Sequence, residues 1–140
     1  MRPTTGVVTV LRWAFVLLLL ASSIGKLLDM AGFITVVESY QSLPPAATPA
    51  AAWGLVATEL VLAIWLATGS ALPRSTLAIV GLHAMYFFWI GTALLRGLSL
   101  ANCGCFGVYL ARPLTGWTLL EDGVLLLLAL LLWKNSGQRY

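Results

Sequence analysis

The chain has 140 residues, of which 60% are apolar and 9% are charged, and its mean hydropathy is +0.93. Soluble domains carry about 25% charged residues, so this composition excludes an ordinary water-soluble fold and indicates that lipid is the solvent. The net charge is +3, but the basic residues are scattered singly, which excludes the basic stripe of a nucleic-acid-binding surface.

Four apolar segments, each roughly 18 to 22 residues long, are long enough to cross a bilayer as helices. They cover residues 7–28, 51–68, 75–95 and 116–133. Because backbone groups inside lipid must form hydrogen bonds within their own segment, we expect an all-α integral membrane bundle of four transmembrane helices. The whole chain, residues 1–140, is expected to form one small domain.

The first apolar segment has a second interpretation as a secretory signal peptide. Arg2 and Arg12 accompany an apolar run that is followed by small residues, as in such peptides. The apolar stretch continues beyond the small residues to Leu28, which favours a helix that is retained.

The distribution of Lys and Arg predicts the orientation. With four crossings the two termini share one side of the membrane, and Lys and Arg are enriched in cytoplasmic loops. The side of the termini has Arg2, Arg12, Arg74, Lys134 and Arg139, whereas the other has Lys26, Arg96 and Arg112 offset by Asp29, Glu38, Glu121 and Asp122. We therefore expect a bacterial inner-membrane protein with cytoplasmic termini and a cysteine-containing loop in the oxidising periplasm.

Both cysteines of the chain lie in the sequence "NCGCFG", residues 102–107. A bond between Cys103 and Cys105 would close a very small ring, and Gly104 would relieve part of the strain by adopting unusual backbone angles. Strained, exposed disulfides are the labile ones, and so small a loop gives little entropic stabilisation. This pattern favours a redox-active pair at the outer membrane surface, with Arg96 and Arg112 near enough to stabilise a thiolate.

Two alternatives for the cysteines stay open. The thiolates suit a soft metal such as Cu(I), although the sequence has no His/Cys spacing typical of a tetrahedral zinc site. They can also be inert thiols or a structural bridge.

Four further polar residues within or beside the apolar segments are candidates for a site. Glu59 lies in the second segment, where a carboxyl group is costly and is expected to face the bundle interior, paired with His83 or a basic side chain. That contact either fixes helix packing or forms a proton path or quinone contact. Glu121 and Asp122 suit the N-terminus of the fourth helix, or pair with basic residues, or relay protons.

Three sequences resemble the methylamine utilisation protein MauE family, within the broader MauE/DoxX-like redox-associated membrane proteins. They are "SIGKLLDMAGFITVVESYQSLPP" at 23–45, "ATELVLAIWLATG" at 57–69 and "RGLSLANCGCFG" at 96–107. The last is the most specific, and the resemblance covers nearly the whole chain.

The resemblance implies a four-helix inner-membrane protein that supports maturation of a periplasmic client, as in biogenesis of the methylamine dehydrogenase light chain, together with a thioredoxin-like partner. By the same resemblance Cys103 and Cys105 match the family's cysteine motif, and Lys26, Glu59 and Arg96 match its recurrent charged positions.

Two classes of function follow. The first is a thiol–disulfide oxidoreductase, or the membrane partner of one, that exchanges with a periplasmic thiol protein and passes electrons to or from a membrane quinone. The second is a non-enzymatic assembly or transport factor that binds a soft metal through the two cysteines. A purely structural subunit is a third possibility, and it predicts that the cysteines are dispensable.

Overall fold

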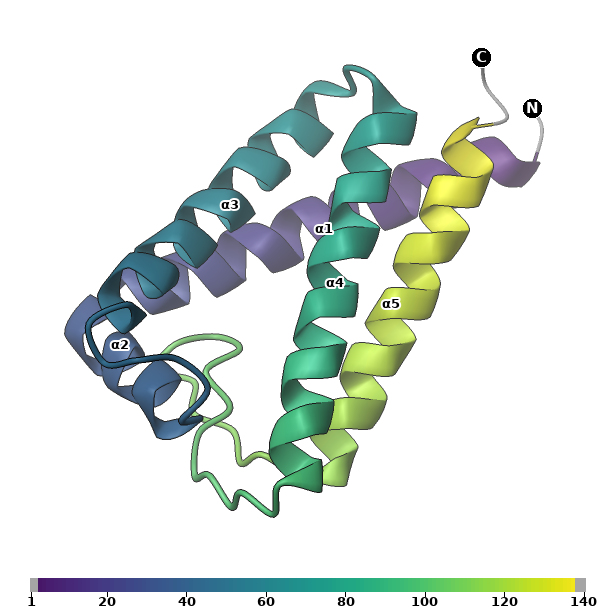
Figure 1. Ribbon diagram of the computed structural model, residues 1–140. Helices are drawn as coiled ribbons and strands as arrows, with labels where there is room; N and C mark the ends of the chain where they lie inside the picture. The colour runs from purple at the N-terminus through teal and green to yellow at the C-terminus, as the bar shows by residue number, and fades with distance from the viewer. Residues whose placement is uncertain (1–2, 138–140) are drawn as a thin grey trace.

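The computed structural model describes residues 3–137, and all regular structure within that range is helical (Figure 1). The helices are α1 (Pro3–Leu27), α2 (Met30–Ser39), α3 (Thr48–Thr68), α4 (Leu72–Leu95) and α5 (Gly116–Ser136). All except α2 are long and apolar enough to cross a membrane, which confirms the predicted four-helix membrane fold. Arg2 and Arg139, which were used for the orientation, lie outside the described residues.

Helix α2 is absent from the sequence prediction, because its ten residues are too short to span a bilayer. It begins directly after α1, where the carboxylate of Asp29 accepts a hydrogen bond of 2.9 Å from the backbone N–H of Gly32 and so caps the new helix. Phe33 of α2 is buried and packs with Ala52 and Val56 of α3. Part of the predicted loop between the first two membrane helices is therefore a packed helix.

The four long helices alternate in direction, so the two termini lie at the same end of the bundle (Figure 1). Helices α3 and α4 are joined by a tight turn near that end, where Gly69 ends α3 in the left-handed conformation with φ 72°. From this turn the two helices diverge, and α2 and the loop between α4 and α5 occupy the opposite end (Figure 1). The α2 helix and the loop that contains both cysteines therefore lie at the end of the bundle opposite the termini (Figure 1).

Arg12, the charged residue inside α1, binds the end of α3. Its Nε donates a hydrogen bond of 2.7 Å to the carbonyl of Leu66, and its Nη2 donates another to the carbonyl of Ala67. The last carbonyl groups of a helix lack partners within the helix and carry partial negative charge, so a guanidinium there is stabilising. This contact gives Arg12 a structural role.

Candidate functional site

The loop of residues 96–115 folds back against the bundle and brings the cysteines with it. Arg96 anchors its start by donating hydrogen bonds of 2.8 and 3.2 Å to the carbonyls of Tyr40 and Gln41, at the end of α2. The backbone N–H of Cys103 donates a 2.7 Å hydrogen bond to the carbonyl of Arg112, which closes the loop on itself. The Arg96 side chain thus binds these carbonyls and the hydroxyl of Ser42 rather than the thiols.

Glycines allow the loop to lie directly on α1. A Cβ atom at Gly107, whose φ is +81°, would overlap the carbonyl oxygen of Gly25, and one at Gly25 would overlap the carbonyl oxygen of Phe106. Gly104, also at φ +81°, would place its Cβ 2.9 Å from Val36 of α2. The loop was expected to be exposed, but these glycines bring its cysteine-containing part into close contact with α1 and α2, which buries Cys103.

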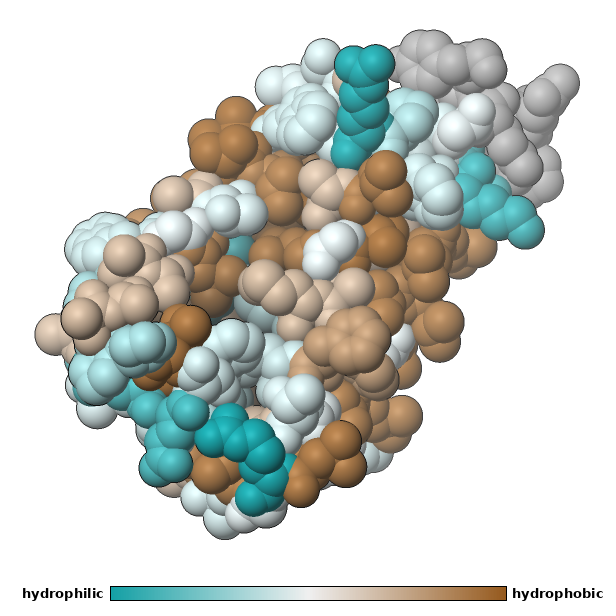
Figure 2. All heavy atoms as spheres, viewed as in Figure 1, coloured by the Kyte–Doolittle hydropathy of each residue, from teal (hydrophilic) through white to brown (hydrophobic). Residues whose placement is uncertain are grey.

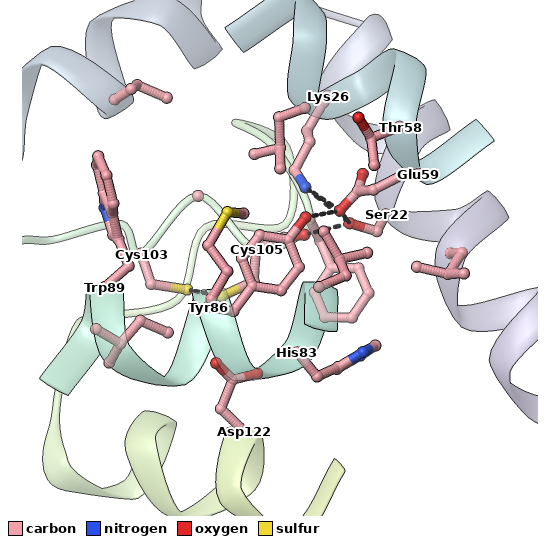
Figure 3. Close-up of a pocket in the computed structure, with 18 of the residues that line it drawn as sticks. Ser22, Lys26, Thr58, Glu59, His83, Tyr86, Trp89, Cys103, Cys105 and Asp122 are labelled. Atoms are coloured by element: carbon pink, nitrogen blue, oxygen red, sulfur yellow. Dashed lines mark hydrogen bonds and ion pairs between the residues drawn. The ribbon is translucent and has the colours of Figure 1, made fainter. Parts of the chain in front are cut away.

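The two thiols face each other inside this fold. The Sγ atoms of Cys103 and Cys105 are 2.7 Å apart, and both cysteines are free (Figure 3). Cys103 is only 7% exposed and Cys105 is half-buried. The hydroxyl of Tyr40 donates a hydrogen bond to the carbonyl of Cys103. The hydroxyl of Ser22 donates one of 2.6 Å to the carbonyl of Cys105. The loop backbone therefore fixes both sulfur atoms.

The two thiols differ in acidity. The pKa of Cys103 is lowered to about 7, first because its thiolate accepts a hydrogen bond from the Cys105 thiol, and further by the backbone N–H of Cys105 and the Arg112 guanidinium. The pKa of Cys105 is raised because it shares its proton with Cys103 and because it is buried. The negative charge of Asp122 adds to that rise, and the Lys26 ammonium opposes it. Cys103 is therefore the thiolate of the pair near neutral pH.

A buried ion pair lies beside the thiols. Lys26 of α1 and Glu59 of α3 are joined by an Nζ–Oε1 distance of 2.6 Å, with side chains 2% and 1% exposed. The Oγ of Ser22 lies 3.0 Å from Nζ and 3.1 Å from the same Oε1, which also accepts a hydrogen bond from the hydroxyl of Tyr86 (Figure 3). The second carboxylate oxygen of Glu59 is buried and has no hydrogen-bond partner among the described residues. The expected basic partner of Glu59 is thus Lys26.

His83, the other expected partner of Glu59, is engaged elsewhere. Its Nδ1 lies 3.0 Å from the carbonyl oxygen of Ile79, one turn earlier in α4. Its ring makes edge-on contacts with Phe15 and Tyr86, at centroid distances of 5.2 and 6.0 Å. Of the two expected partners of Glu59, His83 or a basic side chain, the structure shows the second, and the Nδ1 of His83 contacts the Ile79 carbonyl instead.

The two acidic residues of α5 behave differently. Glu121 pairs with Arg112 at 2.6 Å between Nη1 and Oε2, one of the pairings expected from the sequence, and both side chains are partly exposed. Asp122 is 8% exposed, and its Oδ2 is buried without a hydrogen-bond partner among residues 3–137. A buried carboxylate oxygen without a donor is uncommon in folded proteins and calls for a partner.

These groups surround one cavity of about 590 Å³, to which all the long helices, α2 and the cysteine loop contribute. Figure 2 shows the molecular face between α3 and α4 hollowed, with hydrophilic atoms at depth between apolar ones. Cys103, Cys105, Glu59 and Asp122 all line this cavity. Within the described part of the chain no group of three or more His, Cys, Asp or Glu is placed to hold a metal ion.

Sequence reasoning missed three residues of the site, namely Ser22, Tyr40 and Tyr86. Ser22 and Lys26 are four residues apart, the spacing that places two side chains on one helix face, and this signal was available. Tyr86 lies three residues after His83 and shares its face for the same reason. Tyr40 gave no signal, because its role depends on α2, which was not predicted.

Comparisons with known proteins identify relatives of this chain. The family model described as methylamine utilisation protein MauE matches residues 4–134. The methylamine utilization protein MauE of Paracoccus denitrificans is 29% identical over 120 residues, which are 86% of this chain and 64% of that protein. The chain therefore spans somewhat less than two thirds of the length of this relative. No solved structure matches the chain.

Proposed function

This chain belongs to the methylamine utilisation protein MauE family, and we propose that it acts as a membrane thiol–disulfide redox protein that supports maturation of a periplasmic client. The observation that carries the proposal is the pair of sulfur atoms 2.7 Å apart, held by the loop backbone at the wall of a cavity. Only a small movement separates this distance from a disulfide bond of about 2.05 Å. The family's name supports a role in methylamine utilisation, and the client that we propose is of the kind of the methylamine dehydrogenase light chain.

The two cysteines have separate roles in this exchange. A thiolate of a thioredoxin-like partner attacks Cys105 of the oxidised pair, because Cys105 is more exposed than Cys103. The Cys103–Cys105 bond breaks, and Cys103 leaves as a thiolate, which its low pKa favours. The partner's second thiol then attacks the mixed disulfide, so the partner becomes oxidised and this pair becomes the dithiol.

The proposal includes an orientation in the bacterial inner membrane. Arg12, Arg74 and Lys134 lie toward the end that carries the termini, and no acidic residue within 3–137 offsets them there. This excess supports cytoplasmic termini, with α2 and the cysteine loop on the periplasmic side. The thiols would then work in the oxidising compartment.

Trapping the thiol states tests the proposal. Cells that carry the wild type, Cys103→Ser or Cys105→Ser are treated with a thiol-alkylating reagent, and adducts are identified by mass spectrometry. We expect Cys103→Ser to accumulate a mixed disulfide between Cys105 and a periplasmic thioredoxin-like protein, and Cys105→Ser to accumulate less. Two thiols that stay reduced under oxidant, with normal client maturation in the double serine variant, would refute the redox role. Retention of Cu(I) by such a reduced pair would support the soft-metal alternative.

A further inference from the structure

The cavity beside the thiols opens where the helices are surrounded by lipid. Thr58, Gly81 and Met85 line it and are exposed at the molecular surface, and they lie near the middle of α3 and α4. Both helices are long and apolar enough to span a membrane, so their middle lies at the depth of the hydrocarbon core. A molecule that enters between them comes from the bilayer and is therefore soluble in lipid.

The size and walls of the cavity suit an organic ring. A volume of about 590 Å³ falls within the range of roughly 300–1,000 Å³ typical of small-molecule sites. The walls are mostly apolar, and they include the rings of Phe33, Tyr86 and Trp89. Aromatic rings of this kind pack well against the faces and edges of a planar head group.

The polar end of the cavity contains two carboxylate oxygens without hydrogen-bond donors. Glu59 is fully buried and Asp122 is 8% exposed, and each has a buried oxygen without a partner among the described residues. The Lys26 ammonium has three N–H donors, of which Ser22 and Glu59 take two. An occupant that accepts a hydrogen bond from Lys26 through a carbonyl when oxidised, and donates hydroxyl protons to the two carboxylates when reduced, would serve all three groups in turn over one redox cycle.

The reaction proposed for the thiols requires an acceptor of this kind. Each cycle of oxidation of the thioredoxin-like partner leaves Cys103 and Cys105 as a dithiol, which must lose two electrons and two protons to become a disulfide again. We propose that the cavity binds the head group of a membrane quinone, which reoxidises this dithiol. This inference rests on the proposed function and names its electron acceptor.

The step balances as follows. The S–S bond between Cys103 and Cys105 forms, both S–H protons are released, and the quinone takes up two electrons and two protons to become a quinol. The sulfur atoms line the cavity, so the quinone ring reaches them without a second cysteine pair. Asp122, whose charge acts on the Cys105 thiol, and Glu59 are the carboxylates through which protons pass.

Other occupants fit these observations less well. A lipid acyl chain enters from the same side, but it offers no group to the unpartnered oxygens of Glu59 and Asp122. A client peptide carries polar backbone, so it cannot approach through the hydrocarbon core. A quinone has both the apolar tail that reaches the opening and the polar ring that fits the closed end.

Two glycines supply a matched test. Gly81 lines the opening, Gly54 does not line the cavity, and a Cβ at either would meet no atom within 4 Å. Both are exposed helical positions, so Gly81→Leu and Gly54→Leu make the same change with the same benefit to helix propensity. Only the first places a side chain in the path of a ligand.

The experiment uses purified, reduced protein in lipid nanodiscs without oxygen, with decyl-ubiquinone as the acceptor. We expect wild type and Gly54→Leu to form one quinol per Cys103–Cys105 disulfide, and Gly81→Leu to react about tenfold more slowly at limiting quinone. A photoreactive azidoquinone should label peptides of the cavity wall, and decyl-ubiquinone should displace it whereas decylbenzene should not. Displacement by decylbenzene as well would assign the cavity to acyl chains and overturn the inference.

A second oxidant separates this inference from the proposed function. Oxidised glutathione exchanges with thiols without a quinone site, so it should oxidise the pair equally in wild type and Gly81→Leu. Oxidation by glutathione but not by decyl-ubiquinone would overturn the quinone site and leave the redox function standing. Failure of both oxidants would overturn the two together.

Discussion

Lys26 and Glu59 are 33 residues apart in sequence, and their 2.6 Å ion pair is buried directly beneath the cysteine loop. Ser22 connects the two features, because its hydroxyl contacts Glu59 at 3.1 Å and the carbonyl of Cys105 at 2.6 Å. The position of the thiols in the loop is therefore linked to a charge pair between α1 and α3. A change in this pair is expected to affect both the bundle and the thiols.

Loss of one partner of the ion pair should destabilise the bundle. Glu59→Leu leaves the Lys26 ammonium buried without its countercharge, at a cost of about 3–5 kcal/mol in the free energy of unfolding. Glu59→Gln keeps an acceptor for Tyr86 and Ser22 and should lose less. Replacing the pair by apolar residues, in Lys26→Met combined with Glu59→Leu, should recover much of the loss.

Thermal unfolding of the four proteins in one detergent measures this difference. The double variant serves as the control, because it carries the Glu59→Leu substitution without the unpaired charge. A Glu59→Leu protein as stable as wild type would show that the ion pair does not contribute to the stability of the bundle.

The contact between Gly25 and the cysteine loop gives a second prediction. Gly25→Ala places a methyl group against the carbonyl of Phe106, so the loop must move away from α1. We expect the burial of Cys103 to be lost and its alkylation by a membrane-impermeant maleimide to speed up. Gly6→Ala is the matched control, because Gly6 lies in the same helix and its added Cβ meets nothing within 4 Å.

The high helix propensity of alanine favours α1 and so opposes the expected destabilisation by Gly25→Ala. Alanine in place of glycine stabilises a helix interior by about 1 kcal/mol. Any loss of stability in Gly25→Ala relative to Gly6→Ala therefore reports the loop contact. Equal alkylation rates in the two variants would mean that the loop is not held by this contact.

The membrane helices could be predicted from the sequence because hydropathy alone determines them. Apolar runs long enough to span a bilayer must be helical, and the structure places helices over all four. Helix α2 could not be found in this way, because it is short and its packing depends on Phe33 reaching α3. Asp29 is a residue type that often caps a helix N-terminus, and it does so here. Aspartate is equally common in turns that begin no helix, so its presence alone does not predict α2.

The candidate site was predictable in its residue types and not in its contacts. An intramembrane carboxylate must find a partner, so Glu59 was expected to pair with a basic side chain, and Lys26 is that side chain. Whether Glu59 pairs with Lys26 or His83 depends on which residues of neighbouring helices lie at the same depth in the bundle. Hydropathy does not determine this register. Burial of the thiols depends on the backbone contact between Gly25 and Gly107. These two glycines lie far apart in the sequence, so no local pattern predicts their contact.

The orientation is a third prediction. A reporter fused to the C-terminus should lie in the cytoplasm, because Arg74 and Lys134 lie at that end of the bundle. Green fluorescent protein should fluoresce in this fusion, and alkaline phosphatase should be inactive. The reverse pattern would place the thiols in the reducing cytoplasm and contradict the redox argument. Fusions after Arg112 supply the matched control, with the opposite reporter active.

The acidity of Cys103 gives the last prediction, which concerns pH. A pKa of about 7 means that Cys103 is half thiolate at pH 7 and loses its reactivity as the pH falls through this value. An ordinary thiol with a pKa of about 8.5 is only a few per cent thiolate at the same pH. The rate of Cys103 alkylation, followed by mass spectrometry of the reduced protein, should therefore rise with a midpoint near pH 7.

Cys105→Ala tests the cause of that acidity. The variant removes the thiol that donates a hydrogen bond to the Cys103 thiolate, which is the largest contribution to the lowered pKa. The midpoint should therefore move upward, toward about 8.5. Arg112→Gln should move it in the same direction by less, because the guanidinium is partly exposed and already paired with Glu121. A midpoint unchanged in Cys105→Ala would show that the two thiols do not share a proton, and Cys103 would then have no preference as the leaving thiolate.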